Sequence, residues 1–243
     1  MSGLSTIELP VVDLPAGLCW LVATPIGNLA DISLRALAVL DGVDLVLAED
    51  TRHTRRLFSR YGLTTHLQPY HDHNKERQTP RVIERLQAGG RVALVSDAGM
   101  PAVADPGFVL VRALREADLA YTVVPGPSSV LTGLVLSGLP TDRFLFCGYT
   151  PRKSGRLRTF LSEALAERGT VVLLESVHRI RKTLVALQEL APDRELAIAR
   201  ELTKLHEEVL RGTAAELLEL MDGPRLKGEL VLLLRGTPAG RSE

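Results

Sequence analysis

A loop with two aspartates and two glycines is the part of this sequence best suited to bind a small molecule. It runs from Ser96-Asp97-Ala98-Gly99-Met100-Pro101 to Asp105-Pro106-Gly107, and the apolar run 92–95 before it predicts a buried strand. Ligands of open α/β sheets bind beyond the carboxyl ends of the strands, and glycine lets the backbone come close to a ligand. The loop therefore predicts one wall of a binding site. The pattern leaves a second interpretation open, in which the aspartates only cap turns and the next helix.

Two other polar stretches are weaker candidates for chemistry. Residues 24–29, Thr-Pro-Ile-Gly-Asn-Leu, follow a predicted strand but contain neither GxGxxG nor GxxxxGK[ST], the glycine patterns that bind phosphate. His71-Asp72-His73 offers two metal-ligand side chains, yet residues i and i+2 of an extended segment point to opposite sides. A loop leading into a helix is the simpler interpretation, so we predict no metal site.

Basic side chains form two clusters in a chain with 29 Lys and Arg against 29 Asp and Glu. The first comprises Arg52, Arg55, Arg56 and Arg60. The second lies in residues 151–182 and comprises Arg152, Lys153, Arg156, Arg158, Arg168, Arg179, Arg181 and Lys182, against Glu163, Glu167 and Glu175. A solvated basic face explains such clusters, and contact with RNA phosphates is the alternative. Aromatic residues are only 4% of the chain, which favours recognition of RNA shape and backbone over base stacking.

Strands and helices alternate in the N-terminal half, which predicts a largely parallel sheet with crossover helices. Strands are expected at 18–23, 44–48, 66–70, 91–95 and 121–124, and helices at 34–39, 54–61, up to 88, 108–117 and 130–136. Ser33 is a candidate cap for the first helix. The third helix can begin after Asn74, or after Thr79 with Pro80 at its first position.

The pattern changes after the stretch 138–142, which is the best candidate for a domain boundary. Beyond it, strands are expected at 143–149, 170–174, 195–199, 209–211 and 230–235, and the last three indicate an antiparallel arrangement. Thr213 and Glu216 fit a capping box. The predicted organisation is a flexible leader at 1–17, an N-terminal α/β domain at 18–137, a C-terminal α/β domain at 138–235 and a tail at 236–243.

Composition points to a globular protein of the cytoplasm. Hydrophobic residues are 45% and charged residues 24% of 243 residues. Cys19 and Cys147 lie in apolar runs without ligand spacing, which favours buried thiols over a disulfide. Residues 1–17 lack the basic start of a signal peptide, and no apolar run approaches the ~18 residues of a membrane span. We therefore expect no membrane partner.

An ordered set of short strings runs through the chain from about residue 18 to 235. The strings are Thr-Pro-Ile-Gly-Asn-Leu at 24–29, Ala-Glu-Asp-Thr-Arg-His at 48–53, His-Asp-His-Asn at 71–74, Val-Ser-Asp-Ala-Gly at 95–99, Asp-Pro-Gly at 105–107, Pro-Gly-Pro at 125–127, Arg-Glu-Leu-Thr-Lys at 200–204 and Lys-Gly-Glu at 227–229. Each string is weak alone, but together they resemble the ribosomal small-subunit RNA methyltransferase I family, a branch of the tetrapyrrole methylase superfamily. Two positions depart from that family: Met100 and Val177 stand where it usually has Thr.

The resemblance implies a fold, a cofactor and a substrate. The fold would be the two-domain α/β class III methyltransferase fold, with a parallel-sheet N-terminal domain and a mixed-sheet C-terminal domain. The protein would be a homodimer that binds S-adenosylmethionine between its domains. It would methylate the ribose 2′-hydroxyl of a cytidine in the decoding region of 16S rRNA, free or in the small ribosomal subunit. A tetrapyrrole methyltransferase and a non-catalytic RNA-binding assembly factor are the alternatives.

Site residues follow from combining the resemblance with the predicted loops. The cofactor-binding candidates are Pro25, Ser96, Asp97, Ala98, Gly99, Pro101, Val103, Asp105, Pro127 and Ser128. A ribose hydroxyl needs a positioned base, and the candidates are Asp50, Glu175, Glu201 and Lys204, although Asp50 could instead cap a helix and Glu201 could pair with Lys204. The RNA-binding candidates are Arg52, Arg55, Arg56, Arg152, Lys153, Arg156 and Arg179.

Overall fold

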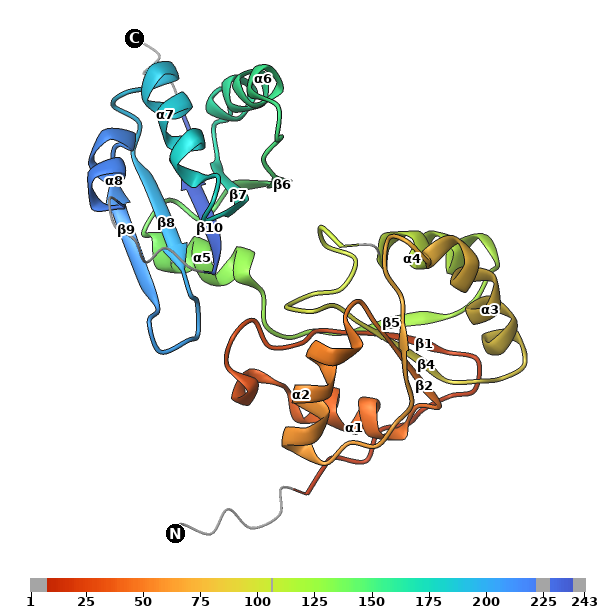
Figure 1. Ribbon diagram of the computed structural model, residues 1–243. Helices are drawn as coiled ribbons and strands as arrows, with labels where there is room; N and C mark the ends of the chain where they lie inside the picture. Colours follow the sequence, from red (N-terminus) through yellow and green to blue (C-terminus); the bar gives the residue numbers. More distant parts are fainter. Residues whose placement is uncertain (1–7, 106, 222–227, 238–243) are drawn as a thin grey trace, which may run out of the picture. The chain divides into compact units, whose positions relative to one another are not determined.

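The computed structural model describes residues 8–105, 107–221 and 228–237, and the chain divides into two compact units, 1–128 and 129–243 (Figure 1). The division falls between Ser128 and Ser129, ahead of the boundary expected at Gly138. The helix at 129–137 packs on strands of the second unit, and a Cβ at Gly133 would lie 3.0 Å from Cγ1 of Val231. This close approach explains why the helix belongs to the second unit.

The first unit is a parallel sheet with helices on both faces, as predicted. Its strands are β1 (Cys19–Val22), β2 (Leu45–Ala48), β3 (Leu67–Pro69), β4 (Val92–Val95) and β5 (Tyr121–Val124), in the order β3-β2-β4-β1-β5. Its helices are the 3-10 turn η1 (Leu29–Asp31), α1 (Leu34–Gly42), α2 (Thr51–Tyr61), α3 (Lys75–Gln87) and α4 (Gly107–Glu116). Alternate strand residues enter two cores, one under α1 and α2 and the other under α3 and α4.

Part of the predicted leader packs on the first unit. Leu9, Val12 and Leu14 are partly buried against the core under α1 and α2. A Cβ at Gly42 would come within 2.3 Å of Cδ1 of Leu14, so this glycine lets the segment lie against α1. The prediction of a flexible leader is therefore wrong for residues 8–17, and residues 1–7 lie outside the described part of the chain.

The second unit contains a mixed sheet. Its strands are β6 (Phe144–Tyr149), β7 (Thr170–Ser176), β8 (Leu196–Arg200), β9 (Glu208–Gly212) and β10 (Glu229–Leu234), in the order β6-β7-β10-β8-β9. β6 and β7 are parallel, whereas β10 is antiparallel to β7 and β8, and β8 to β9. The helices are α5 (Ser129–Ser137), α6 (Ser154–Leu165), α7 (Ile180–Leu190) and α8 (Ala214–Leu220). The helices α6, α7 and α8 cover the main core of the sheet.

Helix starts test the local signals of the sequence. Ser33 caps α1 by accepting a hydrogen bond from the Ala36 N–H, and Thr213 and Glu216 form the predicted capping box. The helix α3 begins after Asn74, so the alternative start after Thr79 is wrong and Pro80 lies inside the helix. None of the helices described is long and apolar enough to cross a membrane.

Replacing Gly133 tests the packing of α5 on the second sheet. We expect Gly133→Val to lower the free energy of unfolding by about 1–3 kcal/mol, because the added methyl groups collide with Val231. The control is Gly155→Ala in α6, where an added Cβ meets nothing within 4 Å, and it should leave stability unchanged or slightly raise it. Urea unfolding measures both variants. A Gly133→Val protein as stable as the parent would contradict the packing of α5.

Candidate active site

The first unit has its topological switch point between β1 and β4. The chain leaves β1 toward α1 on one face of the sheet and leaves β4 toward α4 on the other (Figure 1). Open α/β sheets bind ligands where neighbouring strands diverge in this way. The loops after the two strands are joined there, because Thr24 N donates to Gly99 O at 2.9 Å and Gly99 N donates to Thr24 O at 3.0 Å.

Buried hydroxyl groups fix the beginning of the loop after β4. Thr24 Oγ1 donates to Ser96 O at 3.1 Å, and Ser96 Oγ donates to Gly99 O at 3.1 Å. Both residues are buried. Ser96 is predicted to bind the cofactor, but its hydroxyl donates to the backbone of its own loop and so stabilises the loop conformation.

Three strand-end loops converge around Gly99, whose φ of 80° is in the left-handed region. A Cβ at this position would lie 3.4 Å from Cγ2 of Ile26 and 3.6 Å from the carbonyl oxygen of Pro127. A Cβ at Gly126 would lie 3.0 Å from the Ala23 side chain. The loops after β1, β4 and β5 therefore form one surface with backbone groups close together, as the sequence predicts for a cofactor wall.

The rest of the loop after β4 is held in a strained conformation. Ala102 and Ala104 have φ of 68° and 61°, a region that costs a non-glycine residue about 1–3 kcal/mol. The Asp105 carboxylate accepts hydrogen bonds from Ala102 N at 2.9 Å and from Gly107 N at 2.7 Å. Burial raises the pKa of Asp105 above its ordinary value. The Asp105 carboxylate thus stabilises the backbone of its own loop. Val103, in the same loop, is exposed to solvent.

Asp97 connects the loops after β4 and β2. Its Oδ1 accepts a hydrogen bond from Asp50 N at 2.9 Å, and in the part of the chain described no donor contacts its Oδ2. Asp97 is only half-buried, whereas Ala98 beside it is exposed. The second carboxylate oxygen is therefore available to a hydroxyl or ammonium group of a ligand.

Asp50 is the N-cap of α2, the structural role that the sequence left open for it. Its carboxylate accepts from Arg52 N at 2.8 Å and forms an ion pair with the Arg52 guanidinium at 3.2 Å. These contacts hold the pKa of Asp50 below its ordinary value. A carboxylate with a lowered pKa is a weaker proton acceptor, so this geometry does not favour Asp50 as the base.

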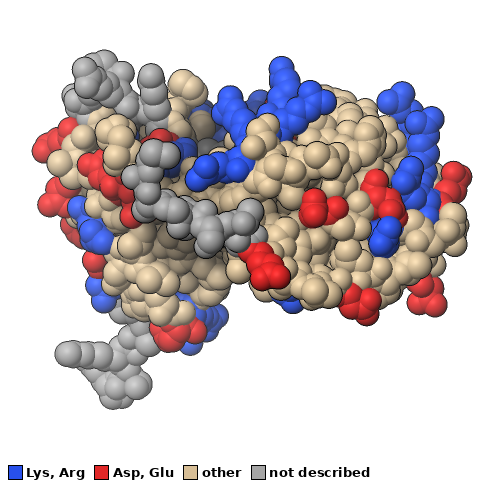
Figure 2. All heavy atoms as spheres, turned by 90° about the horizontal axis from the view of Figure 1, so that it is seen from below, with Lys and Arg blue, Asp and Glu red and all other residues tan. Residues whose placement is uncertain are grey.

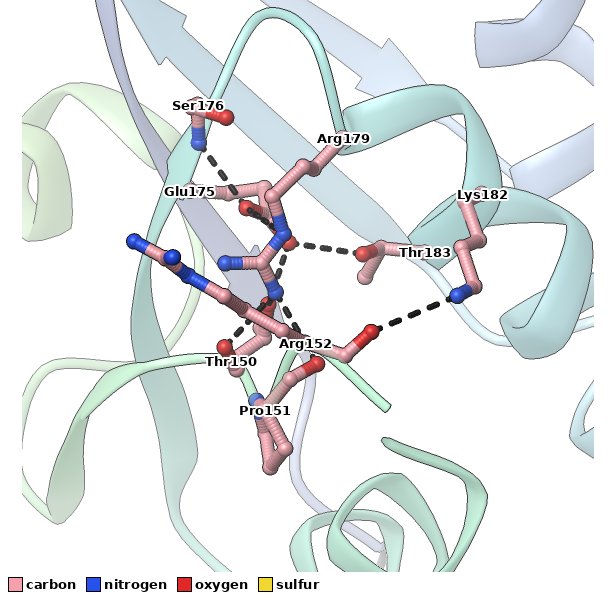
Figure 3. Close-up of polar contacts among 8 residues, drawn as sticks. All are labelled: Thr150, Pro151, Arg152, Glu175, Ser176, Arg179, Lys182 and Thr183. Atoms are coloured by element: carbon pink, nitrogen blue, oxygen red, sulfur yellow. Dashed lines mark hydrogen bonds and ion pairs between the residues drawn. The ribbon is translucent and has the colours of Figure 1, made fainter. Parts of the chain in front are cut away.

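Glu175 is at the centre of a buried polar cluster in the second unit (Figure 3). The Thr183 hydroxyl donates to Oε2 at 2.7 Å, the Thr150 hydroxyl donates to the same oxygen, and Ser176 N donates to Oε1 at 2.9 Å. Arg179 Nε lies 3.6 Å from Oε1. The Glu175 side chain has 0% exposure. Both carboxylate oxygens are engaged and the side chain is shielded from solvent, so we do not retain Glu175 as a candidate base.

Arg179 points into the same cluster. Its Nη2 lies 2.7 Å from both the carbonyl oxygen and the hydroxyl of Thr150, and 3.0 Å from the carbonyl oxygen of Pro151 (Figure 3). The side chain is 27% exposed, and its Nη2 group is committed to protein acceptors. This placement differs from the role of phosphate anchor expected from the sequence.

Glu201 and Lys204 form the ion pair expected as their structural role, with Nζ 3.0 Å from Oε1. The backbone of Glu201 is in the left-handed region, with φ of 50°. A Cβ at Gly228 would collide with Oε1 of Glu201, so Gly228 lies directly against Glu201 of the string at 200–204. Lys227 itself lies outside the described residues.

The remaining basic candidates are on the surface. Arg52, Arg55 and Arg56 are exposed on α2, and Arg152, Lys153 and Arg156 are exposed in the loop before α6 and its first turn. Figure 2 shows Lys and Arg side chains gathered in clusters on the face drawn, with scattered Asp and Glu side chains on the same face. Across the described ranges no group of three His, Cys, Asp or Glu residues could hold a metal ion.

Comparison with known proteins assigns this chain to a family. The family of Tetrapyrrole (Corrin/Porphyrin) Methylases matches residues 19–218. A Halalkalibacterium halodurans protein named Ribosomal RNA small subunit methyltransferase I is 42% identical over 220 residues, which are 90% of this chain and 76% of that protein. The Escherichia coli O157:H7 protein of the same name is 44% identical over 226 residues, 92% of this chain and 79% of that protein. The chain belongs to the ribosomal RNA small subunit methyltransferase I family.

A solved structure supports the fold of this methyltransferase. The crystal structure of uroporphyrin-III-C-methyltransferase from Thermus thermophilus matches with a TM-score of 0.62 and 27% identity over 90% of this chain and 94% of that chain. The predicted class III methyltransferase fold, with a parallel and a mixed sheet, is confirmed. Members of the family use S-adenosylmethionine as methyl donor, and this chain is an enzyme of that class.

The surface around Gly99 is our candidate for the site of this cofactor. It offers close backbone groups from the loops after β1, β4 and β5, and the free Asp97 oxygen can accept hydrogen bonds from a ribose hydroxyl or an ammonium group.

The sequence analysis did not identify Thr150 and Thr183, whose hydroxyl groups donate to Glu175 in the second unit. A threonine before Pro151 and one four residues after Arg179 on the same helix face were the available signals.

Two variants of Asp97 distinguish the structural role of its Oδ1 from the ligand-binding role expected of its Oδ2. Asp97→Asn can keep the acceptor for Asp50 N but replaces the other oxygen by a donor, whereas Asp97→Ala loses both. We expect both variants to weaken S-adenosylmethionine binding about tenfold or more, with Asp97→Ala also losing stability. Calorimetry and thermal unfolding measure the two effects. Wild-type affinity in folded Asp97→Asn would remove Asp97 from the cofactor site.

Asp105 gives the stability of the protein a specific pH dependence. Its pKa is raised from 3.8 by burial, with the charges of Asp97 and Asp72 adding to this against the hydrogen bonds from Gly107 and Ala102. Between 3.8 and the raised pKa, the folded protein holds a proton that the unfolded chain has released. Raising the pH through this window therefore lowers the wild-type free energy of unfolding relative to that of Asp105→Asn. Urea unfolding of both proteins between about pH 4 and 7 measures it, and parallel curves would contradict it.

Proposed function

We propose that this methyltransferase transfers a methyl group from S-adenosylmethionine to the ribose 2′-hydroxyl of a cytidine in the decoding region of 16S rRNA. The observation that carries the proposal is 42–44% identity over about 90% of the chain to relatives named for methylation of small-subunit ribosomal RNA. The exposed cations on α2 and before α6 support an RNA substrate for a protein with no net charge.

Positioning is the main catalytic task of the chain. S-adenosylmethionine supplies an activated methyl group on a sulfonium. A new O–C bond forms as the C–S bond breaks, and the hydroxyl proton must leave. Holding the reactants in line contributes about 7–11 kcal/mol to such a reaction. The loops joined at Thr24 and Gly99 contain Pro25 and Pro101, and the loop after β5 contains Pro127. They are suited to this task because hydrogen bonds and proline rings limit their motion.

The described contacts reduce the number of candidate residues that could accept the hydroxyl proton. Asp50 has a lowered pKa and Glu175 is enclosed by donors, so neither is suited to take a proton from a hydroxyl. Glu201 and Lys204 remain the candidates, and they form an ion pair just after the end of β8, in which Lys204 is exposed and Glu201 is partly buried. The strained backbone of Glu201 is of the kind that occurs at functional sites.

We also propose that the enzyme acts as a homodimer in the cytoplasm, on free 16S rRNA or the small subunit. The support for a dimer is apolar surface on edge strands within each unit. Tyr121 and Val123 on β5 are 39% and 42% exposed, and Phe144 and Leu145 on β6 are each 41% exposed. Exposed edges of this kind are commonly covered by another chain.

Two rivals make different demands on the same loops. A tetrapyrrole methyltransferase would share the cofactor loops but would not need exposed cations, and the identity to the uroporphyrin-III-C-methyltransferase is lower, 27%. A non-catalytic RNA-binding assembly factor would not bind the methyl donor. Calorimetry with S-adenosylmethionine separates that last possibility, since no binding would exclude an enzyme.

Methyl transfer to RNA is the decisive test. Incubation with labelled S-adenosylmethionine and under-methylated small subunits should place label on one cytidine of 16S rRNA. The labelled nucleotide should resist alkaline cleavage on its 3′ side, because a methylated 2′-oxygen cannot attack the phosphate. Label on a base, or transfer only to a tetrapyrrole, would contradict the proposal. Heat-inactivated enzyme is the control.

A further inference from the structure

The loop between β6 and α6 presents cations to solvent. It lies outside the regular sheet. Arg152 and Lys153 are exposed in it, and Arg156 is exposed in the first turn of α6. Such a loop would normally sample many conformations, and ordering it on an RNA would reduce affinity. Its backbone therefore needs a fixed support if its side chains are to bind a defined set of phosphates.

Two side chains near the start of α7 supply that support. Arg179 Nη2 donates to the carbonyl oxygens of Thr150 and Pro151 at 2.7 and 3.0 Å, and Lys182 Nζ donates to that of Arg152 at 3.4 Å. Three consecutive carbonyl groups are thus held from one helix. Figure 3 shows the Arg152 guanidinium extending away from this cluster while its carbonyl group faces Lys182.

Glu175 fixes Arg179 in turn. Its Oε1 lies 3.6 Å from Arg179 Nε, and its other oxygen accepts from the hydroxyls of Thr150 and Thr183. Thr183 is fully buried, with 0% exposure, so it cannot touch an RNA. The carboxylate cancels the charge of the guanidinium and leaves its donors aimed at the loop.

We propose that Glu175 and Arg179 are positioning residues for the RNA-binding loop at 150–153. They hold its backbone so that Arg152 and Lys153 meet phosphates of the substrate in a fixed geometry, and neither contacts the RNA itself. The inference rests on the proposed function for the identity of the substrate, whereas the support of the loop is a property of the free protein.

Arg179→Lys tests this role because lysine keeps the charge beside Glu175 but cannot span several acceptors with a planar group. Without RNA, we expect amide hydrogen exchange at 152–156 to become about tenfold faster. Binding of under-methylated small subunits should weaken about tenfold, with S-adenosylmethionine affinity unchanged. Arg168→Lys, an exposed arginine beyond the other end of α6, is the matched control and should match the wild type in all three measurements.

A double-mutant cycle distinguishes positioning from direct contact. In an Arg152→Gln, Lys153→Gln background, Arg179→Lys should have almost no further effect on RNA affinity, because its effect passes through these two cations. A full tenfold loss in that background would overturn the proposal and make Arg179 a phosphate contact. Unchanged exchange and unchanged RNA affinity in Arg179→Lys would also overturn it.

Thr183→Val covers the case in which Arg179→Lys fails to fold. Removing this buried donor to Glu175 should weaken RNA binding about twofold to threefold, and unchanged binding with unchanged exchange would overturn the proposal. Wild-type protein that binds no small subunit would contradict the proposed function and the RNA role of the loop together. In that case faster exchange at 152–156 in Arg179→Lys would still separate support of the backbone from the choice of substrate.

Discussion

The reciprocal hydrogen bonds between Thr24 and Gly99 are the interaction on which the candidate cofactor site depends. The chains that leave β1 and β4 diverge to opposite faces of the sheet, so their loops have no strand partner beyond the sheet edge. Pairing the two loops satisfies their backbone groups and fixes the starting point of everything that follows. The buried hydroxyls of Thr24 and Ser96 can then be used inside the loop, and the left-handed alanines further along can be held by Asp105.

Each unit uses a carboxylate to organise a loop, Asp105 being partly buried and Glu175 fully buried. Asp105 accepts from two backbone N–H groups of the loop after β4, and Glu175 accepts from two hydroxyls and a backbone N–H beside the loop after β6. A buried carboxylate is stable only if its oxygens have such partners. Once they do, these oxygens have little capacity left for chemistry. A reaction whose methyl donor is already activated gains more from such rigid support than from another acid or base.

The elements of the fold could be predicted from local patterns, but some boundaries and roles could not. The apolar run 92–95 and the caps at Ser33 and Thr213 are local signals, and the structure follows them. The start of α3 was ambiguous because Thr79 and Pro80 form a strong local signal. The helix begins after Asn74, whose side chain accepts from His71 N and donates to the Pro69 carbonyl oxygen, short-range contacts that shape the turn before the helix.

Glu175 shows why site residues were harder to predict than elements. A glutamate after a strand looks like a residue of an exposed strand-end loop, where a base would be useful. Its actual partners include Thr150, 25 positions earlier, and no period in the sequence links them. The leader at 8–17 was mistaken for a different reason, because the spacing of Leu9, Val12 and Leu14 was a usable signal of packing.

The distribution of charge connects the fold to the substrate. With equal numbers of cations and anions, the protein attracts RNA only where cations are exposed and anions are engaged elsewhere. The negative charge of Glu175 is compensated by Arg179 and by hydroxyl donors, so it does not offset the charges of Arg152 and Lys153. The same contacts fix the loop that carries these two cations. One cluster of polar side chains therefore determines both the geometry and the local charge of the surface before α6, which explains why its carboxylate lies inside the protein.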